Sequence, residues 1–144
     1  GRQGSSKGIL MPATFALCDN ERIVYSRAWG DVTASDLSQH MGSISELVSE
    51  GTIDVTWAQV WDFTEIDSAA ESLSSTSVRR LAMQNPWPKE SIRALVVASP
   101  LAFGLCRMYE ILTGLEDSSA FKITKTVAEA KAYIQAKRAG SIRP

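Results

Sequence analysis

The sequence predicts one α/β domain with a mixed, mostly parallel five-stranded sheet, an N-terminal antiparallel hairpin and about four helices. Three observations lead to this fold class. Residues 14–29 are rich in β-branched and aromatic residues around a polar turn, which is typical of a hairpin. Residues 92–98 form an unbroken apolar run, which is typical of a strand buried on both faces. The other strands alternate with helical patterns, and such alternation builds parallel sheets through right-handed crossovers.

Length and composition favour a single intracellular domain. The chain has 144 residues, enough for a core without disulfides. We expect the domain to span residues 12–138, preceded by a flexible leader or residues left by cloning at 1–11 and followed by a tail at 139–144. Cys18 and Cys106 lack the spacing of a metal or redox motif, so we expect buried thiols in a reducing, cytoplasmic compartment. No apolar run is long enough for a membrane span.

The net charge excludes one class of partner. Fifteen Lys and Arg stand against sixteen Asp and Glu, which gives a formal charge of −1. Nucleic-acid-binding proteins usually carry a clear excess of basic residues, so we expect no nucleic-acid partner.

The opening hairpin consists of strands at 14–18 and 22–29, joined by the polar turn 19–21. The helix that follows has Thr33 as its expected N-cap and Gly51 as its expected left-handed end. Its apolar stripe consists of Leu37, Met41, Ile44 and Val48.

The remaining elements alternate along the chain. They are a strand at 55–63, a short helix around 78–82, a strand at 92–98, a helix at 101–113, a strand at 120–124 and a last helix to about 138. Ser99 is the expected N-cap of the helix at 101–113. Thr126 and Glu129 form the expected capping box of the last helix. The side chains that we expect to be buried are Leu37, Met41, Ile44, Val97, Leu105 and Leu112.

The sequence contains no motif of a known type of active site. Gly-rich phosphate loops, the nucleophile elbow GxSxG and the zinc motif HExxH are all missing. His40 is the only histidine, and we interpret it as a surface or half-buried residue with a structural partner. We therefore expect no catalytic residues, no metal site, no cofactor and no enzymatic activity.

The helix 101–113 is apolar on almost every side and carries one cation, Arg107. Three roles stay open for it: a core helix with an Arg107–Glu110 ion pair, a homodimer seam, or the wall of a ligand site. For the last role, a ligand would place its apolar tail against Phe103 and Leu112 and its anionic head near Arg107 or the helix start at Ser99. The full set of candidate ligand-binding residues is Trp61, Phe63, Ser99, Phe103, Arg107 and Leu112.

The order of elements, the step Asp67-Ser68 and the segments at 99–110 (SPLAFGLCRMYE) and 121–133 resemble the SpoIIAA-like (STAS or STAS/SEC14-like) bacterial domain family. The resemblance covers most of residues 12–136. It implies a non-enzymatic regulatory or binding module in the bacterial cytoplasm. Its partner would be a small apolar or amphipathic, lipid-like ligand, a membrane that it contacts peripherally, or another protein. The resemblance also implies the alternative of an anti-sigma-antagonist-like partner switch, with Ser68 as the phosphorylated serine.

Overall fold

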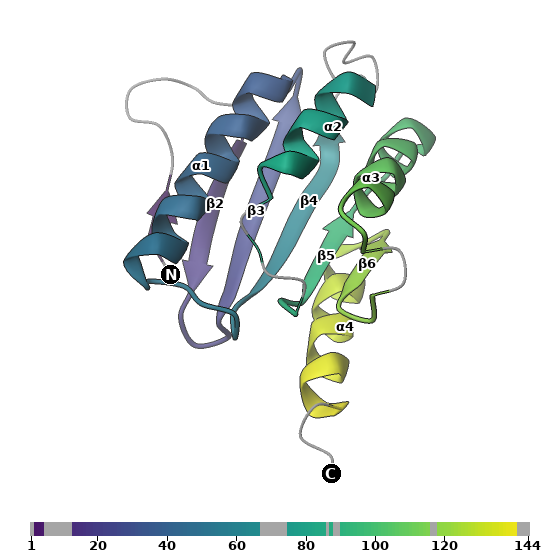
Figure 1. Cartoon of the computed structure of the whole chain (residues 1–144). Coiled ribbons are helices and arrows are strands. Elements are labelled where there is room, and N and C mark those ends of the chain that lie inside the picture. Colours follow the sequence, from purple (N-terminus) through teal and green to yellow (C-terminus); the bar gives the residue numbers. More distant parts are fainter. Residues whose placement is uncertain are drawn as a thin grey trace.

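The computed structural model describes residues 2–4, 13–66, 75–85, 87, 90–115 and 118–140. Its strands form one six-stranded sheet in the order of the sequence, β1 to β6 (Figure 1). The elements are β1 (Arg2–Gly4), β2 (Ala13–Cys18), β3 (Ile23–Gly30), α1 (Ala34–Glu50), β4 (Ala58–Ile66), α2 (Ser75–Met83), β5 (Arg93–Val96), α3 (Pro100–Leu112), β6 (Phe121–Thr124) and α4 (Val127–Gly140).

The pairing of the strands confirms the predicted fold class. β2 and β3 form the antiparallel hairpin, and β3, β4, β5 and β6 pair in parallel. The difference from the prediction is β1, which lies in the expected leader and pairs antiparallel with β2. An unpaired strand edge offers backbone donors and acceptors to any segment that reaches it, so the sequence RQG joins the sheet without a strand pattern of its own.

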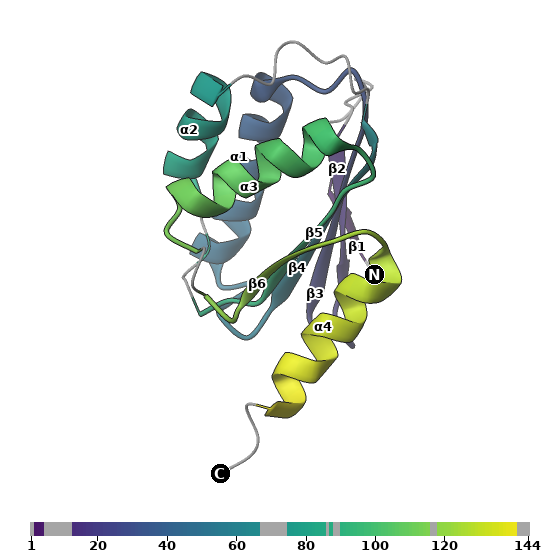
Figure 2. The ribbon, with the colours of Figure 1, turned by 90° about the vertical axis from the view of Figure 1, so that its right-hand side faces the viewer.

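Helices cover both faces of the sheet: α1, α2 and α3 lie on one face, and α4 lies on the other (Figure 2). Because successive side chains of a strand point to opposite faces, the central strands contribute side chains to two separate cores. Val60, Ala94 and Val96 pack with Ala130 and Ile134 of α4. The side chains between them point to the three-helix face, where the candidate site lies.

The helix ends agree with their predicted caps. Thr33 Oγ1 accepts from Asp36 N at 3.1 Å, and Asp36 Oδ2 accepts from Thr33 N at 2.9 Å. Ser99 Oγ accepts from the backbone N–H of Ala102 at 3.1 Å. Gly51 has a φ of 79°, the left-handed conformation that favours glycine. The Thr126–Glu129 capping box is also present.

Several strand boundaries differ from the predicted ones, most clearly those of β4 and β5. β4 begins at Ala58, three residues after the predicted start, because residues 54–57 form a turn in which Asp54 Oδ1 accepts from Thr56 N at 2.8 Å. Side chains of this kind often close such turns, which compete with strand pairing. β5 is shorter than predicted and ends at Val96.

The predicted core is confirmed for Leu37, Ile44 and Val97, which are buried. The other three residues, Met41, Leu105 and Leu112, are half-buried. Both cysteines are free thiols, Cys106 buried and Cys18 half-buried. Among the described residues, no helix has the length and hydrophobicity that crossing a bilayer requires.

Truncation of the core should destabilise the domain strongly. Ile44 is 1% exposed, so Ile44→Ala removes buried methyl groups and leaves a void; we expect a loss of about 2–5 kcal/mol in the free energy of unfolding. Urea unfolding measures this loss. Met83→Ala is the control, since Met83 is 84% exposed and should change the stability by no more than about 0.5 kcal/mol. Equal effects of the two variants would contradict the assigned packing.

Candidate functional site

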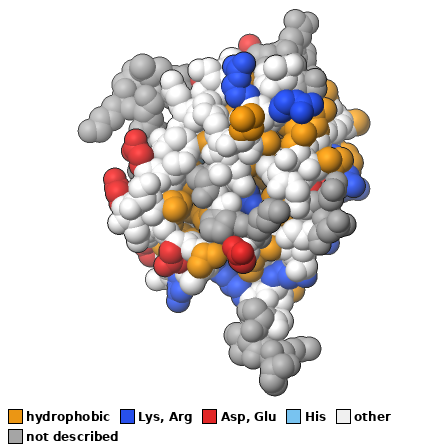
Figure 3. Space-filling model, viewed as in Figure 1, with side chains coloured by type: hydrophobic (Ala, Val, Ile, Leu, Met, Phe, Trp, Pro, Cys, Tyr) orange, Lys and Arg blue, Asp and Glu red, His pale blue; other side chains and the backbone are white. Residues whose placement is uncertain are grey.

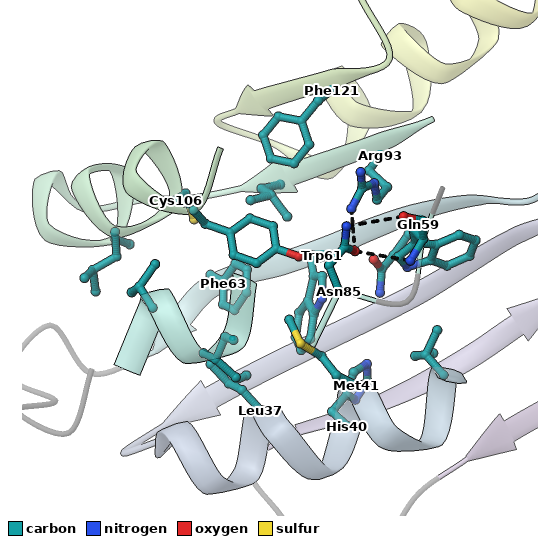
Figure 4. Close-up of a pocket in the computed structure, with 18 of the residues that line it drawn as sticks. Leu37, His40, Met41, Gln59, Trp61, Phe63, Asn85, Arg93, Cys106 and Phe121 are labelled. Atoms are coloured by element: carbon teal, nitrogen blue, oxygen red, sulfur yellow. Dashed lines mark hydrogen bonds between the residues drawn. The ribbon is translucent and has the colours of Figure 1, made fainter. Parts of the chain in front are cut away.

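A cavity lies between the three-helix face of the sheet and helices α1, α2 and α3 (Figure 4). The void open to the centre of a water-sized sphere is about 80 Å³. One water molecule needs roughly 10–15 Å³ by this measure, so the cavity has room for a chain of several atoms. Met41 and Leu105, which line the cavity, are half-buried.

The register of the parallel strands sets the order of side chains along the cavity. Arg93 of β5 pairs with Gln59 of β4 and with Phe121 of β6, so these three form one row across the sheet. Two residues further along, Leu95 pairs with Trp61 and Ile123 to form the next row on the same face. The first row carries the charge and the amide, and the second row is apolar. The cavity is therefore polar at one end and apolar at the other.

The apolar end is built from aromatic and aliphatic side chains of three elements. The rings of Trp61 and Phe63 stack with centroids 4.6 Å apart at an angle of 11°. Leu37 of α1 and Cys106 of α3 face this stack (Figure 4). Burial raises the pKa of the Cys106 thiol to about 12, so the thiol stays protonated and behaves as an apolar group.

At the polar end, Arg93 is the central residue, and its side chain is only 2% exposed. Its Nη1 donates to Asn85 Oδ1 at 2.8 Å, and the guanidinium lies 5.7 Å from the centroid of the Phe121 ring. Among the described residues, no group meets hydrogen-bond geometry at Nε or Nη2, and the neutral Tyr109 hydroxyl is the further polar group that interacts with the guanidinium. No carboxylate among the described residues forms an ion pair with Arg93. Burial lowers the pKa of this guanidinium, which nevertheless stays charged at neutral pH.

Asn85 is held in place by the chain that follows α2. Its Oδ1 also accepts from Trp87 N at 3.2 Å, and its Nδ2 donates to Trp87 O at 3.3 Å. These bonds fix which end of the amide meets the arginine. Asn85 therefore satisfies one nitrogen of Arg93 and cannot turn to cover the others.

His40 lies beside the cavity in a buried polar network. It is 5% exposed, which corrects the expectation of a surface or half-buried histidine. Its Nε2 lies 2.9 Å from Ser26 Oγ, which also accepts from Gln59 Nε2 at 3.0 Å. The Trp61 ring lies 4.4 Å from the imidazole, centroid to centroid, and burial lowers the pKa of His40 to about 4. The imidazole is therefore neutral at pH 7.

A serine and a histidine at this distance are also the pair that activates a nucleophile in many hydrolases. Ser26 does not line the cavity, however, and its side chain is buried between β3 and α1. Its hydroxyl is occupied by the amide of Gln59 as well as by His40. The geometry therefore favours a structural role, in which the network fixes Gln59 beside Arg93.

The structure brings only two of the candidate ligand-binding residues to this cavity, Trp61 and Phe63. On α3, the face toward the sheet consists of Ala102, Leu105, Cys106 and Tyr109, which follow helical spacing. The candidates Ser99, Phe103, Arg107 and Leu112 are not part of the lining.

Each of these four residues has another place in the fold. Ser99 caps α3. Phe103 is 50% exposed, in a region where hydrophobic side chains reach the surface over α3 (Figure 3). Arg107 is exposed and forms the ion pair with Glu110 that the sequence left open. Leu112 borders a shallow depression between α2 and α3. Ser68 lies outside the described residues, and its phosphorylation stays a prediction.

The residue that the sequence pattern did not reveal as a site is Arg93. It lies inside the apolar run 92–98, which was read only as a buried strand. The available signal was the charge itself, since an arginine in a strand covered on both faces is rarely buried without a partner. Gln59 and Asn85 gave no comparable signal.

Comparison with known proteins agrees with this architecture. No family model and no curated protein matches the chain. A solved structure does match: an uncharacterised protein of the DUF3478 family from Shewanella loihica PV-4, described as having a SpoIIAA-like fold, with a TM-score of 0.57 over 90% of this chain and 99% of that chain. The two sequences are 15% identical. This chain has a SpoIIAA-like fold.

That finding confirms the fold expected from the resemblance. At this level of identity, the likeness extends to the fold alone. The cavity of this SpoIIAA-like domain has therefore to be interpreted from its own residues.

Protonation of His40 should make the SpoIIAA-like domain less stable in weak acid. Because burial lowers the pKa of His40 from 6.5 to about 4, the unfolded chain binds a proton in this range that the folded chain does not. Stability is then complete above pH 6.5 and falls as the pH falls toward 4, by up to about 3 kcal/mol from this group.

Urea unfolding at pH 7 and pH 5 measures this loss. His40→Gln is the control, because it keeps a polar side chain but removes the titrating group, while carboxylate contributions remain in both proteins. We expect a smaller loss of stability in the variant. The same loss in both proteins would show that His40 is not the group responsible.

Proposed function

We propose that this domain is a non-enzymatic binding module that takes a small apolar or amphipathic molecule into the cavity between the sheet and helices α1, α2 and α3. The observation that carries the proposal is the void itself. Protein cores are packed closely, with few empty spaces larger than a water molecule. A void of about 80 Å³ with largely apolar walls has the properties of a preformed ligand site.

The lining supports binding more than catalysis. The Cys106 thiol is kept protonated by its surroundings, and His40 is engaged with Ser26. Among the described residues, no group of acidic, histidine or cysteine side chains could hold a metal ion. The SpoIIAA-like fold and the resemblance to STAS domains also favour a regulatory or binding role.

The outer face of α3 supports the other associations predicted from the sequence. Leu101, Phe103 and Ile111 of α3 are each about half exposed. Such residues suit a homodimer seam, a protein partner or peripheral contact with a membrane. Each of these stays a prediction, as does the cytoplasmic location.

Filling part of the cavity should weaken ligand binding. Titration of the wild-type protein with octanol should produce a saturable change in fluorescence, because Trp61 and Trp87 line the cavity. Leu105→Phe adds a ring to the lining and should weaken octanol binding by roughly tenfold or more, since one or two methylene groups of the ligand lose their place.

Leu101→Phe is the matched control. It makes the same change one turn earlier on α3, at a residue that is exposed and does not line the cavity. This variant should bind octanol as the wild type does. Unsaturable fluorescence in the wild type, or equal binding by Leu105→Phe, would refute the proposal.

A further inference from the structure

The polar end of the cavity holds a charge that the described part of the protein does not balance. Arg93 is almost completely buried, and its guanidinium carries a positive charge at neutral pH. The neighbours that contact or surround it are Asn85, Phe121 and Tyr109, none of which is an anion. Burial raises the pKa of the Tyr109 hydroxyl, so this group also stays neutral. A buried charge without a counterion is unfavourable, which makes Arg93 a strong site for an anion.

The unpartnered atoms of Arg93 define the shape of that anion. Nη1 is engaged by Asn85, whereas Nε and Nη2 meet no hydrogen-bond partner of good geometry in the described part of the chain. These two nitrogens form one edge of the planar guanidinium, on which two N–H bonds point in the same direction. Such an edge binds the two oxygens of a carboxylate or phosphate at once, by charge-assisted hydrogen bonds.

The charge balance favours a monoanion. Arg93 is the one cationic side chain among the described residues that line the cavity, since His40 is neutral. A phosphate monoester would bring close to two negative charges at pH 7 and leave one without a partner. A carboxylate brings one, which matches one guanidinium.

The rest of the cavity defines the tail. The row of Trp61 and Leu95 follows directly after the row of Arg93, and it leads to the stacked ring of Phe63 (Figure 4). The void has room for a chain of several atoms.

We propose that the ligand is a short- to medium-chain monocarboxylic acid, whose carboxylate accepts hydrogen bonds from Nε and Nη2 of Arg93 and whose alkyl tail lies along Trp61 and Phe63. This assignment rests on the proposed function and names its ligand class. It also moves the anion site from Arg107, the cation expected from the sequence, to Arg93.

The first experiment compares ligands on the unchanged protein. Isothermal titration of the wild type with octanoate, octanol and octyl phosphate separates the head group from the tail. We expect octanoate to bind roughly ten- to a hundredfold more tightly than octanol, which is the usual size of a charge-assisted, bidentate interaction. Octyl phosphate should bind more weakly than octanoate.

The second experiment removes the cation. Arg93→Met keeps the length and the apolar part of the side chain, and it should reduce octanoate affinity by about ten- to a hundredfold while octanol affinity changes by less than about threefold. Arg93→Lys keeps the charge without the two-pronged edge and should be intermediate. Arg107→Met is the matched control and should bind octanoate as the wild type does, because Arg107 is exposed and outside the cavity.

Each outcome decides between the two proposals. Equal affinity for octanoate and octanol would overturn the carboxylate assignment and leave the binding module intact. No binding of either would overturn both. Tighter binding of octyl phosphate than of octanoate would change the class of the anion. A loss of octanoate affinity in Arg107→Met equal to that in Arg93→Met would place the anion away from Arg93. Should Arg93→Met unfold, the ligand comparison on the wild type and the Arg93→Lys and Arg107→Met variants still decide the question.

Discussion

Burial of β4 and β5 on both faces is the constraint on which the rest of the structure depends. With α4 on one side and α1, α2 and α3 on the other, all four residues of β5 and the first four residues of β4 are buried. Alternation then assigns each residue to one of two cores. Small and β-branched residues fill the α4 side, whereas the three-helix side receives Gln59 and Arg93 as well as Trp61 and Leu95. The polar residues on that side need partners within the protein or from a ligand.

The protein supplies those partners in part. Ser26 and His40 hold Gln59, and the chain after α2 holds Asn85 against Arg93. The Ser26 hydroxyl is engaged by both His40 and Gln59, and the Asn85 amide bonds to the Trp87 backbone as well as to Arg93. In the described part of the chain, the guanidinium edge formed by Nε and Nη2 of Arg93 is without such a hydrogen-bond partner. A domain that keeps such an edge inside an apolar cavity loses folding free energy in the empty state, and it recovers this when an anion binds.

Much of the fold follows from local patterns in the chain. The hairpin, the helices and their caps at Thr33, Ser99 and Thr126 depend on neighbouring residues, so their signals survive in the sequence. The predicted start of β4 was early because the Asp54–Thr56 turn competes with strand pairing. β1 had no local signal at all, since its pairing with β2 joins backbone groups rather than a side-chain pattern. The aromatic pair Trp61 and Phe63 lies in one strand and lines the cavity, and its role in ligand binding stays a prediction.

The sequence by itself determined the class of fold, the helix caps and the apolar character of the lining, because each depends on residue types at short spacing. Only the tertiary structure decided which cation faces the cavity. Arg93 and Arg107 both lie in apolar stretches, and the chain does not show that one is buried beside Gln59 and Phe121 while the other pairs with Glu110 at the surface. That outcome depends on strand register and on the rotation of α3 about its axis. Both are set by packing between segments far apart in the sequence.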